Sequence, residues 1–224
     1  MKLGVLFSGG KDSTLAMHLA KKHHEISCLL SMKSENDESY MFHTPNIGIT
    51  ELQAEALDIP LLTGFTSGEK ESELSDLKDL IENAVELFGI DGIVTGAVGS
   101  VYQASRVQKI CAELGLWCFN PLWQFNQVEL LEKLVQEKYE VIISSIAAYP
   151  LDQNWLGRKL DAKAISELKV LQSKYKVHPA GEGGEFESLV LNAPMFKRKI
   201  KILEFEKQYE NHAGVFLVKE ADLE

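Results

Sequence analysis

Short apolar runs alternate with amphipathic segments through the first half of this 224-residue chain, and the alternation limits the folds that it can adopt. Each apolar run has the length of a strand, and each following segment carries apolar residues at helical spacing. The expected strands are residues 2–7, 26–32, 60–62, 92–96 and 116–119, and the expected helices are residues 12–23, 49–57, 74–88 and 101–114. Strands separated by helices favour a parallel sheet covered on both faces. We therefore predict an α/β domain with a doubly wound, five-stranded parallel sheet that binds its ligand at the carboxyl ends of the strands.

The pattern of strands and helices changes after residue 123. The last part of the chain alternates apolar and polar residues as antiparallel strands do. The expected helices are residues 128–136 and 161–173, and the expected strands are residues 141–146, 189–191, 199–205 and 214–218. No linker rich in Pro, Gly or Ser separates the two halves. We therefore predict a first domain over residues 1–124 and a smaller C-terminal α+β domain over residues 125–224, packed tightly against each other.

The formal net charge of −10 argues against a function that needs a basic surface. Nonspecific binding of nucleic acid gains most of its affinity from neutralised phosphates, so no nucleic-acid partner is expected. A local basic patch at residues 197–201 is the exception, although charges at alternate positions of a strand more often form a solvated face.

Apolar runs and cysteines indicate where the chain resides. The apolar runs are much shorter than the roughly 20 residues that a membrane helix needs, so no membrane association is expected. Cys28, Cys111 and Cys118 form no Cys-x-x-Cys pair, which argues against a zinc site or a redox dithiol. Small buried thiols favour a reducing cytoplasm as the location.

A glycine-rich segment, residues 8–13, lies between the first expected strand and the first expected helix. Gly9 and Gly10 let the backbone turn sharply and let a phosphate approach closely. Free N–H groups and the dipole at the start of the helix favour a bound anion. The spacing fits neither a Walker A loop nor a dinucleotide-binding fingerprint.

The other four residues of this segment add polar groups. Ser8 and Ser13 supply hydroxyl donors, and Lys11 supplies a positive charge. Asp12 has the wrong sign for phosphate. It either caps the helix or binds the Mg²⁺ that accompanies ATP.

Residues 96–107 follow the expected fourth strand, whose carboxyl end faces the ligand site of a parallel sheet. Ser100 can cap the next helix. Near the start of that helix lie Tyr102, Gln103 and Arg106. An arginine at this place either pairs with a phosphate or carboxylate, or is an ordinary surface residue.

Residues 181–188 combine three glycines with three carboxylates in the sequence Gly-Glu-Gly-Gly-Glu-Phe-Glu-Ser. Flexible backbone with clustered negative charge suits the recognition of a cation, which could be ammonium, a quaternary ammonium group or Mg²⁺. A solvated acidic loop is the alternative. The residues concerned are Glu182, Gly183, Gly184, Glu185 and Glu187.

Residues 8–13 resemble the phosphate loop of the N-type ATP pyrophosphatases, also called the PP-loop superfamily, which includes asparagine synthetase, GMP synthetase and several tRNA-modifying enzymes. The resemblance implies an adenine-nucleotide α-hydrolase-like fold. It also implies the chemistry of the superfamily. In that chemistry, ATP adenylates a carbonyl or carboxyl oxygen, pyrophosphate leaves, and a nitrogen or sulfur nucleophile displaces AMP.

Residues 96–107 and 181–188, together with residues 148–151 and 155–158, resemble the family of diphthine–ammonia ligases over almost the whole chain. This resemblance implies amidation of diphthine, a trimethylammonium-carrying modified histidine on translation elongation factor 2. ATP would adenylate the diphthine carboxylate, and ammonia from solution would then give diphthamide, AMP and pyrophosphate. The chain departs from the expected Gly-Asp-Ile-x-Ser pattern at Ala97, which stands where an aspartate is expected.

The residue pattern and the resemblance together assign roles to individual residues. ATP is expected at Ser8, Gly9, Gly10, Lys11, Asp12, Ser13, His43 and Gly96, with Asp12 as a Mg²⁺ ligand. Catalysis is expected from Lys11, Ser13, Arg106 and Glu185. Substrate binding is expected at Ser100, Tyr102, Gln103, Glu182, Gly183, Gly184, Glu185 and Glu187, with Trp155 as an aromatic wall. His43 is either a residue that closes over the nucleotide or an ordinary surface histidine.

Two other functions are compatible with the phosphate loop. An ATP-dependent enzyme of the same superfamily that modifies tRNA would need a basic binding surface, and a non-catalytic ATP-binding sensor would have no use for the acidic segment. The ligase would use ATP, Mg²⁺ and ammonia, with elongation factor 2 as its protein partner. The sequence leaves the oligomeric state open, a homo-oligomer included.

Overall fold

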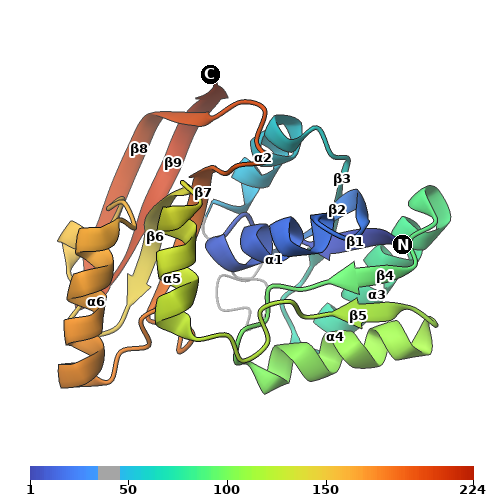
Figure 1. The fold of residues 1–224 in the computed structure, drawn as a ribbon, viewed down its shortest axis with the longest axis horizontal. Helices are drawn as coiled ribbons and strands as arrows, with labels where there is room; N and C mark the ends of the chain where they lie inside the picture. Colours follow the sequence, from blue (N-terminus) through green and yellow to red (C-terminus); the bar gives the residue numbers. More distant parts are fainter. Residues whose placement is uncertain (35–45) are drawn as a thin grey trace.

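The computed structural model describes residues 1–34 and 46–224, and its first sheet has five parallel strands (Figure 1). The strands lie in the order β3-β2-β1-β4-β5, and every neighbouring pair is parallel. They are β1 (Lys2–Leu6), β2 (Glu25–Ser34), β3 (Leu61–Thr66), β4 (Gly92–Val94) and β5 (Trp117–Phe119). The predicted five-stranded parallel sheet is confirmed.

Helices cover both faces of this sheet. They are α1 (Lys11–Lys21), α2 (Thr50–Leu57), which follows the short 3-10 helix η1 (Ile47–Ile49), α3 (Lys70–Phe88) and α4 (Val101–Glu113). Leu15 of α1 packs with Leu29 of β2 on one face, whereas Ile81 of α3 packs with Leu30 on the other. Adjacent residues of a strand point to opposite faces, so both sides of the sheet are buried. The predicted doubly wound arrangement is therefore confirmed.

The strand order reverses between β1 and β4, and this reversal positions the candidate site. From β1 the chain continues to β2 and β3 on one side, and it later adds β4 and β5 on the other side. Ligands of open α/β sheets bind at such a switch point, beyond the carboxyl ends of the strands. Residues 8–13 follow β1 here, and residues 95–100 follow β4.

A second sheet has four antiparallel strands in the order β7-β6-β9-β8. Its strands are β6 (Glu140–Ala147), β7 (Phe186–Asn192), β8 (Ile200–Glu210) and β9 (Ala213–Leu223). The accompanying helices are α5 (Gln127–Gln136), the 3-10 helix η2 (Gln153–Trp155) and α6 (Ala162–Tyr175). α5 and α6 lie side by side next to this sheet (Figure 1). The predicted smaller α+β unit is confirmed.

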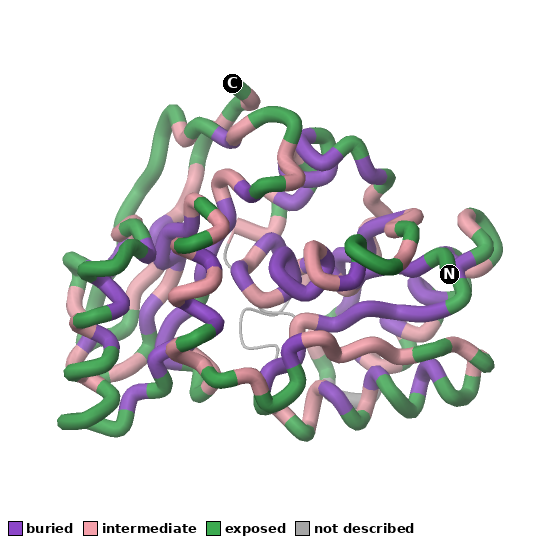
Figure 2. The backbone as a smooth tube through the Cα atoms, in the orientation of Figure 1, coloured by how far each residue is buried: buried purple, intermediate pink, exposed green. Residues whose placement is uncertain are grey.

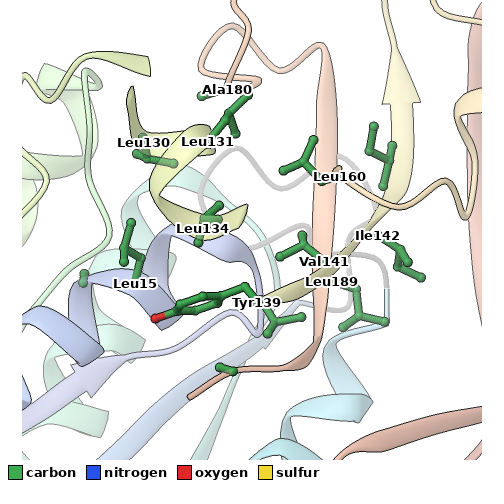
Figure 3. Close-up of a cluster of buried hydrophobic side chains, with 14 of the residues drawn as sticks. Leu15, Leu130, Leu131, Leu134, Tyr139, Val141, Ile142, Leu160, Ala180 and Leu189 are labelled. Atoms are coloured by element: carbon green, nitrogen blue, oxygen red, sulfur yellow. The ribbon is translucent and has the colours of Figure 1, made fainter. Parts of the chain in front are cut away.

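One hydrophobic core continues from the first sheet into the second unit. Figure 3 shows Leu15 of α1 close to Leu134 of α5 and to Tyr139, with Val141 and Leu189 of the second sheet beyond them. All five side chains belong to one buried cluster, and Figure 2 shows buried backbone in both halves of the molecule. The predicted tight packing of the halves is therefore confirmed, whereas the exact boundary after residue 124 stays a prediction.

Several strands are longer than the sequence pattern predicts. β7 begins at Phe186, so the last three residues of the acidic segment are strand and not loop. Glu187 pairs there with Ser145 of β6, and backbone pairing does not require an apolar side chain. β8 and β9 likewise continue through charged residues, because they pair with each other along most of their length. Across the described residues, no helix is both long and apolar enough to cross a membrane.

Candidate functional site

A cavity of about 480 Å³ lies at the carboxyl ends of β1 and β4. Three segments line it: the phosphate loop (residues 8–13), the segment after β4 (residues 95–100) and the acidic segment (residues 181–188). The structure thus brings together the segments that the sequence pattern singles out. The expected site residues that line the cavity are Ser8, Lys11, Asp12, Ser13, Gly96, Ser100, Gln103, Glu182, Gly183, Gly184 and Glu187.

The other expected site residues lie elsewhere. Gly9 and Gly10 belong to the phosphate loop but do not line the cavity. Tyr102, Arg106 and Glu185 do not line it either. His43 lies outside the described residues. The predicted roles of these residues in binding and catalysis stay predictions.

Hydroxyl groups and glycine conformation shape the phosphate loop. Gly9 has a φ of 77°, in the left-handed region that glycine adopts without strain. The Ser13 hydroxyl donates to the Gly10 carbonyl at 3.2 Å, and the Ser8 and Ser13 hydroxyl oxygens are 3.2 Å apart. Gly10 is the N-cap of α1 and provides no side-chain cap, so the alternative in which Asp12 caps the helix is wrong. The loop and the start of α1 therefore leave backbone N–H groups near the cavity, where an anion is favoured.

Gly96 brings the segment after β4 into close contact with α1. A Cβ atom at this position would lie 2.7 Å from the backbone nitrogen of Ser13. Van der Waals repulsion excludes such a contact, so the two loops can meet in this way because residue 96 is glycine.

The first turn of α4 forms as the sequence pattern predicts. Ser100 is the N-cap, and its hydroxyl oxygen accepts a hydrogen bond from the Gln103 N–H at 3.3 Å. The guanidinium carbon of Arg106 lies 3.3 Å from the centre of the Tyr102 ring. This stacking holds Arg106 against its own helix, beside the cavity rather than in its wall.

Lys11 is a buried cation that faces three carboxylates. Its side chain is 4% exposed, and its Nζ donates to Oδ2 of Asp12 at 2.8 Å. Burial lowers the pKa of Lys11, but Asp12, Glu182 and Glu187 outweigh that effect and hold the pKa above its ordinary value. Lys11 therefore keeps its positive charge at neutral pH and is available to an anionic ligand.

One carboxylate oxygen of Asp12 lacks a partner. Its Oδ1 is buried and has no hydrogen-bond partner among the described residues. In the described part of the chain, this site included, no cluster of three or more His, Cys, Asp or Glu side chains could hold a metal ion by itself. Mg²⁺ in nucleotide sites takes one or two carboxylates and completes its shell with phosphate oxygens and water. Asp12 therefore fits a metal ion that is shared with a bound phosphate chain.

Glu182 joins the acidic segment to the first domain. Its Oε2 accepts a hydrogen bond from the Gly99 N–H, in the segment after β4, at 3.0 Å. Desolvation raises the pKa of Glu182, and the nearby charge of Asp12 raises it further. The negative charge of this wall is therefore costly unless a cation lies in the cavity.

Glu187 projects into the cavity from β7. Solvent still reaches its side chain, but the surrounding protein desolvates the carboxyl group and raises its pKa to about 7. Lys11 opposes this shift, whereas Asp12 and Glu182 add to it. Glu187 can therefore take up or release a proton near neutral pH.

Glu185 shapes the acidic segment from within. Its Oε1 accepts hydrogen bonds from the His178 N–H at 2.8 Å and lies 2.8 Å from His178 Nδ1, and its Oε2 accepts from the Gly183 N–H at 2.8 Å. Desolvation raises the pKa of Glu185, but these hydrogen bonds outweigh it and hold the pKa below its ordinary value. The carboxylate therefore fixes the turn that presents Glu182 and Glu187.

Trp155 does not form the expected aromatic wall, and that prediction is wrong. Its side chain is buried in the core cluster, and the Arg158 guanidinium carbon lies 4.3 Å from the ring centre. A large ring gains more free energy from burial in the core than from exposure in a cavity.

The sequence pattern missed the apolar part of the cavity wall. It is formed by Leu6, Phe7, Leu30, Met32, Ile47, Val98 and Val107. Most of these residues belong to, or directly follow, buried strands and helices. Apolar residues at such positions indicate a core equally well, so no sequence signal separates the cavity wall from the core.

Comparison with known proteins connects this geometry with one family. The diphthamide synthase N-terminal domain matches residues 1–118, and the diphthamide synthase C-terminal domain matches residues 126–223. The chain belongs to the diphthamide synthase family. The resemblance seen in the sequence is thereby confirmed, and with it the prediction of a ligase.

Several relatives bear the name diphthine–ammonia ligase. The protein of Bos taurus is 34% identical over 220 residues, which are 89% of this chain and 82% of that protein. The protein of Rattus norvegicus is 35% identical over 222 residues, with coverages of 90% and 83%. The protein of Schizosaccharomyces pombe is 34% identical over 223 residues, which are 92% of this chain but 37% of that longer protein.

A solved structure shows a weaker likeness. The predicted tRNA methyltransferase subunit of Methanocaldococcus jannaschii is 18% identical and has a TM-score of 0.44, over 87% of this chain and 98% of that chain. This likeness is too distant to indicate a function.

Proposed function

We propose that this chain uses ATP to amidate the diphthine carboxylate of translation elongation factor 2 with ammonia, by way of an acyl-adenylate. The observation that carries the proposal is the meeting of the phosphate loop and the acidic segment in one cavity. The phosphate loop favours an anionic leaving group, and the acidic segment favours a cationic substrate. Relatives that bear the name diphthine–ammonia ligase support this assignment.

The nucleotide fits the side of the cavity formed by the first sheet. The apolar side chains of Leu30, Met32 and Val107 suit the adenine ring. The phosphate chain would then extend over the first turn of α1, toward Lys11. Asp12 would hold Mg²⁺ together with the phosphate oxygens, and the ion would offset the charge between the carboxylates and ATP.

The modified residue fits the side of the cavity formed by the second unit. Diphthine carries a quaternary ammonium group beside its carboxylate. Glu182 and Glu187 would attract the ammonium group by charge and so direct the carboxylate toward the phosphate loop. One positive charge (Lys11) faces three carboxylates here, so this side of the cavity carries an excess of negative charge. A modified residue without a cationic group would therefore bind poorly at this place.

The proposed reaction has two displacements. A carboxylate oxygen of diphthine attacks the α-phosphorus of ATP, the bond to the β-phosphate oxygen breaks, and pyrophosphate leaves beside Lys11 and the start of α1. Ammonia then attacks the acyl carbon, the bond to the AMP oxygen breaks, and the nitrogen loses one proton. Glu187 can accept that proton, since its pKa of about 7 matches the task.

The proposed partner and location follow from this chemistry. Elongation factor 2 carries the substrate, and ammonia is expected from solution. Cys28, Cys111 and Cys118 are free thiols, which agrees with the reducing cytoplasm in which translation factors work.

The proposal is tested with elongation factor 2 bearing diphthine, ATP, Mg²⁺ and an ammonium salt. One AMP and one pyrophosphate should form for each amide, and omission of either the modified protein or ammonium should prevent amide formation. Formation of ADP, or of AMP with tRNA in place of the elongation factor, would contradict the proposal. ATP that binds and stays intact under all conditions would indicate the sensor.

A further inference from the structure

The outer edge of β7 is hydrogen-bonded to the phosphate loop. β7 is an edge strand of the second sheet, with β6 on its inner side. On the outer side, the Val190 N–H donates to the Gly9 carbonyl at 3.0 Å, and the Lys11 N–H donates to the Ser188 hydroxyl at 3.1 Å. The same strand presents Glu187 to the cavity. The phosphate loop thus occupies a position that a neighbouring strand would otherwise take.

Gln53 of α2 is hydrogen-bonded to both the phosphate loop and β7. It is fully buried, and its Nε2 donates to the Gly9 carbonyl at 2.9 Å and to the Val190 carbonyl at 2.8 Å. Its Oε1 lies so close to Gly9 that a Cβ atom there would be 2.3 Å away. One side-chain amide therefore fixes the left-handed turn of the loop and the edge of β7 at the same time.

The bonding pattern has a mechanical consequence. A phosphate chain that settles on the loop and draws Gly9 toward it would carry the Gln53 amide, and with it Val190, in the same direction. Loss of a hydrogen bond between buried groups costs free energy, so a movement of Gly9 favours a movement of the Gln53 amide and of Val190 in the same direction. Glu187 lies three residues from Val190 on the same strand.

We propose that Gln53 is a positioning residue that strengthens the link between nucleotide binding at the phosphate loop and the placement of Glu187 and the acidic segment. The inference rests on the proposed function and extends it, since it assigns part of the communication between the two halves of the site to one side chain, beside the direct hydrogen bonds between β7 and the loop. Gln53 does not line the cavity. It acts through Gly9 on one side and Val190 on the other.

Asn46 provides a matched control. Its Nδ2 donates to the Phe216 carbonyl at 2.8 Å, and its Oδ1 accepts from the Val218 N–H at 2.7 Å. It therefore also ties the region of α2 to the second sheet through a side-chain amide. Its contacts are with β9, however, and not with the phosphate loop. Asn46 has a φ of 65°, so replacement by glycine leaves the backbone unstrained.

Hydrogen–deuterium exchange of the full chain, with ATP and Mg²⁺ but no protein substrate, tests the link directly. In the wild type, ATP should slow exchange in residues 8–13 and also in β7. In Gln53→Met, which keeps the volume but removes the amide, ATP should still protect residues 8–13 and should protect β7 clearly less than in the wild type, because only the direct hydrogen bonds between β7 and the loop remain. Asn46→Gly should behave as the wild type does.

A second readout separates positioning from a merely structural role. In the wild type, saturating elongation factor 2 bearing diphthine should tighten ATP binding by about tenfold, within the usual range of coupling between sites. In Gln53→Met the coupling should fall to about twofold or less, with little change in the affinity for ATP by itself. If Gln53→Met does not fold, Gln53→Leu takes its place, because its apolar side chain also removes the donor to both carbonyls and introduces no buried charge.

The outcomes are distinguishable. Protection of β7 and coupling that stay at wild-type values in the Gln53 variant would overturn the inference while leaving the proposed function intact. Equal losses in the Gln53 and Asn46 variants would also overturn it, because they would indicate general loosening of the interface. ATP that protects no segment of the wild type would remove the proposed function and the inference together.

Discussion

At the scale of single residues, the site is a cluster of a few charged side chains that interact with one another. Lys11 is buried beside Asp12 and faces Glu182 and Glu187. Such an arrangement is unfavourable for ATP unless Mg²⁺ or a proton offsets the carboxylates, and it is favourable for a cationic substrate. In the proposed reaction, the same residues would therefore set the need for metal, the choice of substrate and the dependence on pH.

Replacement of the groups that we propose to contact the leaving pyrophosphate should reduce turnover and leave the fold intact. Lys11→Ala and Ser13→Ala are each expected to lower kcat by about 10²–10³, because they remove contacts that strengthen as the charge develops. Steady-state release of pyrophosphate measures the effect, and thermal melting checks the fold. Lys21→Ala, on the exposed end of the same helix, is the control. Near-native kinetics in both variants would reject the assignment.

Glu187 should make stability depend on pH in a defined direction. Its pKa is about 7 in the folded chain against an ordinary value of 4.5, so between these values the folded state binds more protons than the unfolded state. This contribution therefore destabilises the fold as the pH rises through that window, and its full cost is present above it. Glu187→Gln should raise the free energy of unfolding at about pH 8 and change it little at about pH 5.

Urea denaturation at the two pH values measures this difference. Glu86→Gln, an exposed glutamate on α3, is the control and should not change the pH dependence. A Glu187→Gln variant that gained no stability at the higher pH would show that the cavity does not desolvate this carboxyl group.

At the scale of elements, the position of the site follows from how α1 meets its neighbours. The carboxyl ends of β1 and β4 diverge at the switch point of the sheet, and α1 starts between them. The segment after β4 approaches α1 at Gly96, and the edge of β7 approaches it from the second sheet. Close approach of these two segments leaves little freedom for the phosphate loop.

Gly96→Ala should therefore disturb the loop. The added methyl group would meet the Ser13 nitrogen at 2.7 Å, and overpacking of this kind costs about 1–3 kcal/mol. We expect a lower melting temperature and at least about tenfold weaker ATP binding, since the first turn of α1 must shift. Calorimetry measures both effects.

Gly99→Ala is the matched control for this change. A methyl group there would meet Oε2 of Glu182 at 3.7 Å, an ordinary contact. The control should bind ATP as the wild type does. Equal ATP binding by Gly96→Ala would mean that the contact between the two loops does not determine the nucleotide site.

At the scale of the whole molecule, the two sheets form one folding unit. Their shared core includes Leu15 of α1, Leu134 of α5 and Leu189 of β7 (Figure 3). A cavity whose walls come from both sheets needs such a core, because independent movement of the halves would separate the phosphate loop from the acidic segment. The distance between these walls is set by packing rather than by any one contact.

Leu15→Ala should destabilise both halves together. The side chain is fully buried, so the change should cost about 2–5 kcal/mol. Differential scanning calorimetry should show one transition in the wild type and one, at lower temperature, in the variant. Leu87→Ala, at an exposed position of α3, should have little effect. Two separate transitions, with one of them unchanged by Leu15→Ala, would contradict a shared core.

Local sequence patterns predict most helices and strands, and they predict an anion site at the phosphate loop. Apolar periodicity predicts strands and helices because burial of one face is a local requirement. The run of glycine, lysine and serine directly after β1 predicts an anion site, because a strand-to-helix turn exposes N–H groups wherever it occurs. Segments that bear clustered charge, such as residues 181–188, are likewise visible in the sequence as candidates.

Which side chains of those segments reach the cavity depends on long-range packing. Glu185 and Trp155 turn inward because hydrogen bonds and burial satisfy them better there, whereas Glu187 projects into the cavity from a strand that the pattern had treated as loop. Nothing in the sequence around Gln53 indicates its role, since glutamine is common in helices. Its role depends on the contacts with Gly9 and β7, which form only in the folded chain. Contacts between residues far apart in sequence depend on packing, and no local pattern encodes the packing of two sheets.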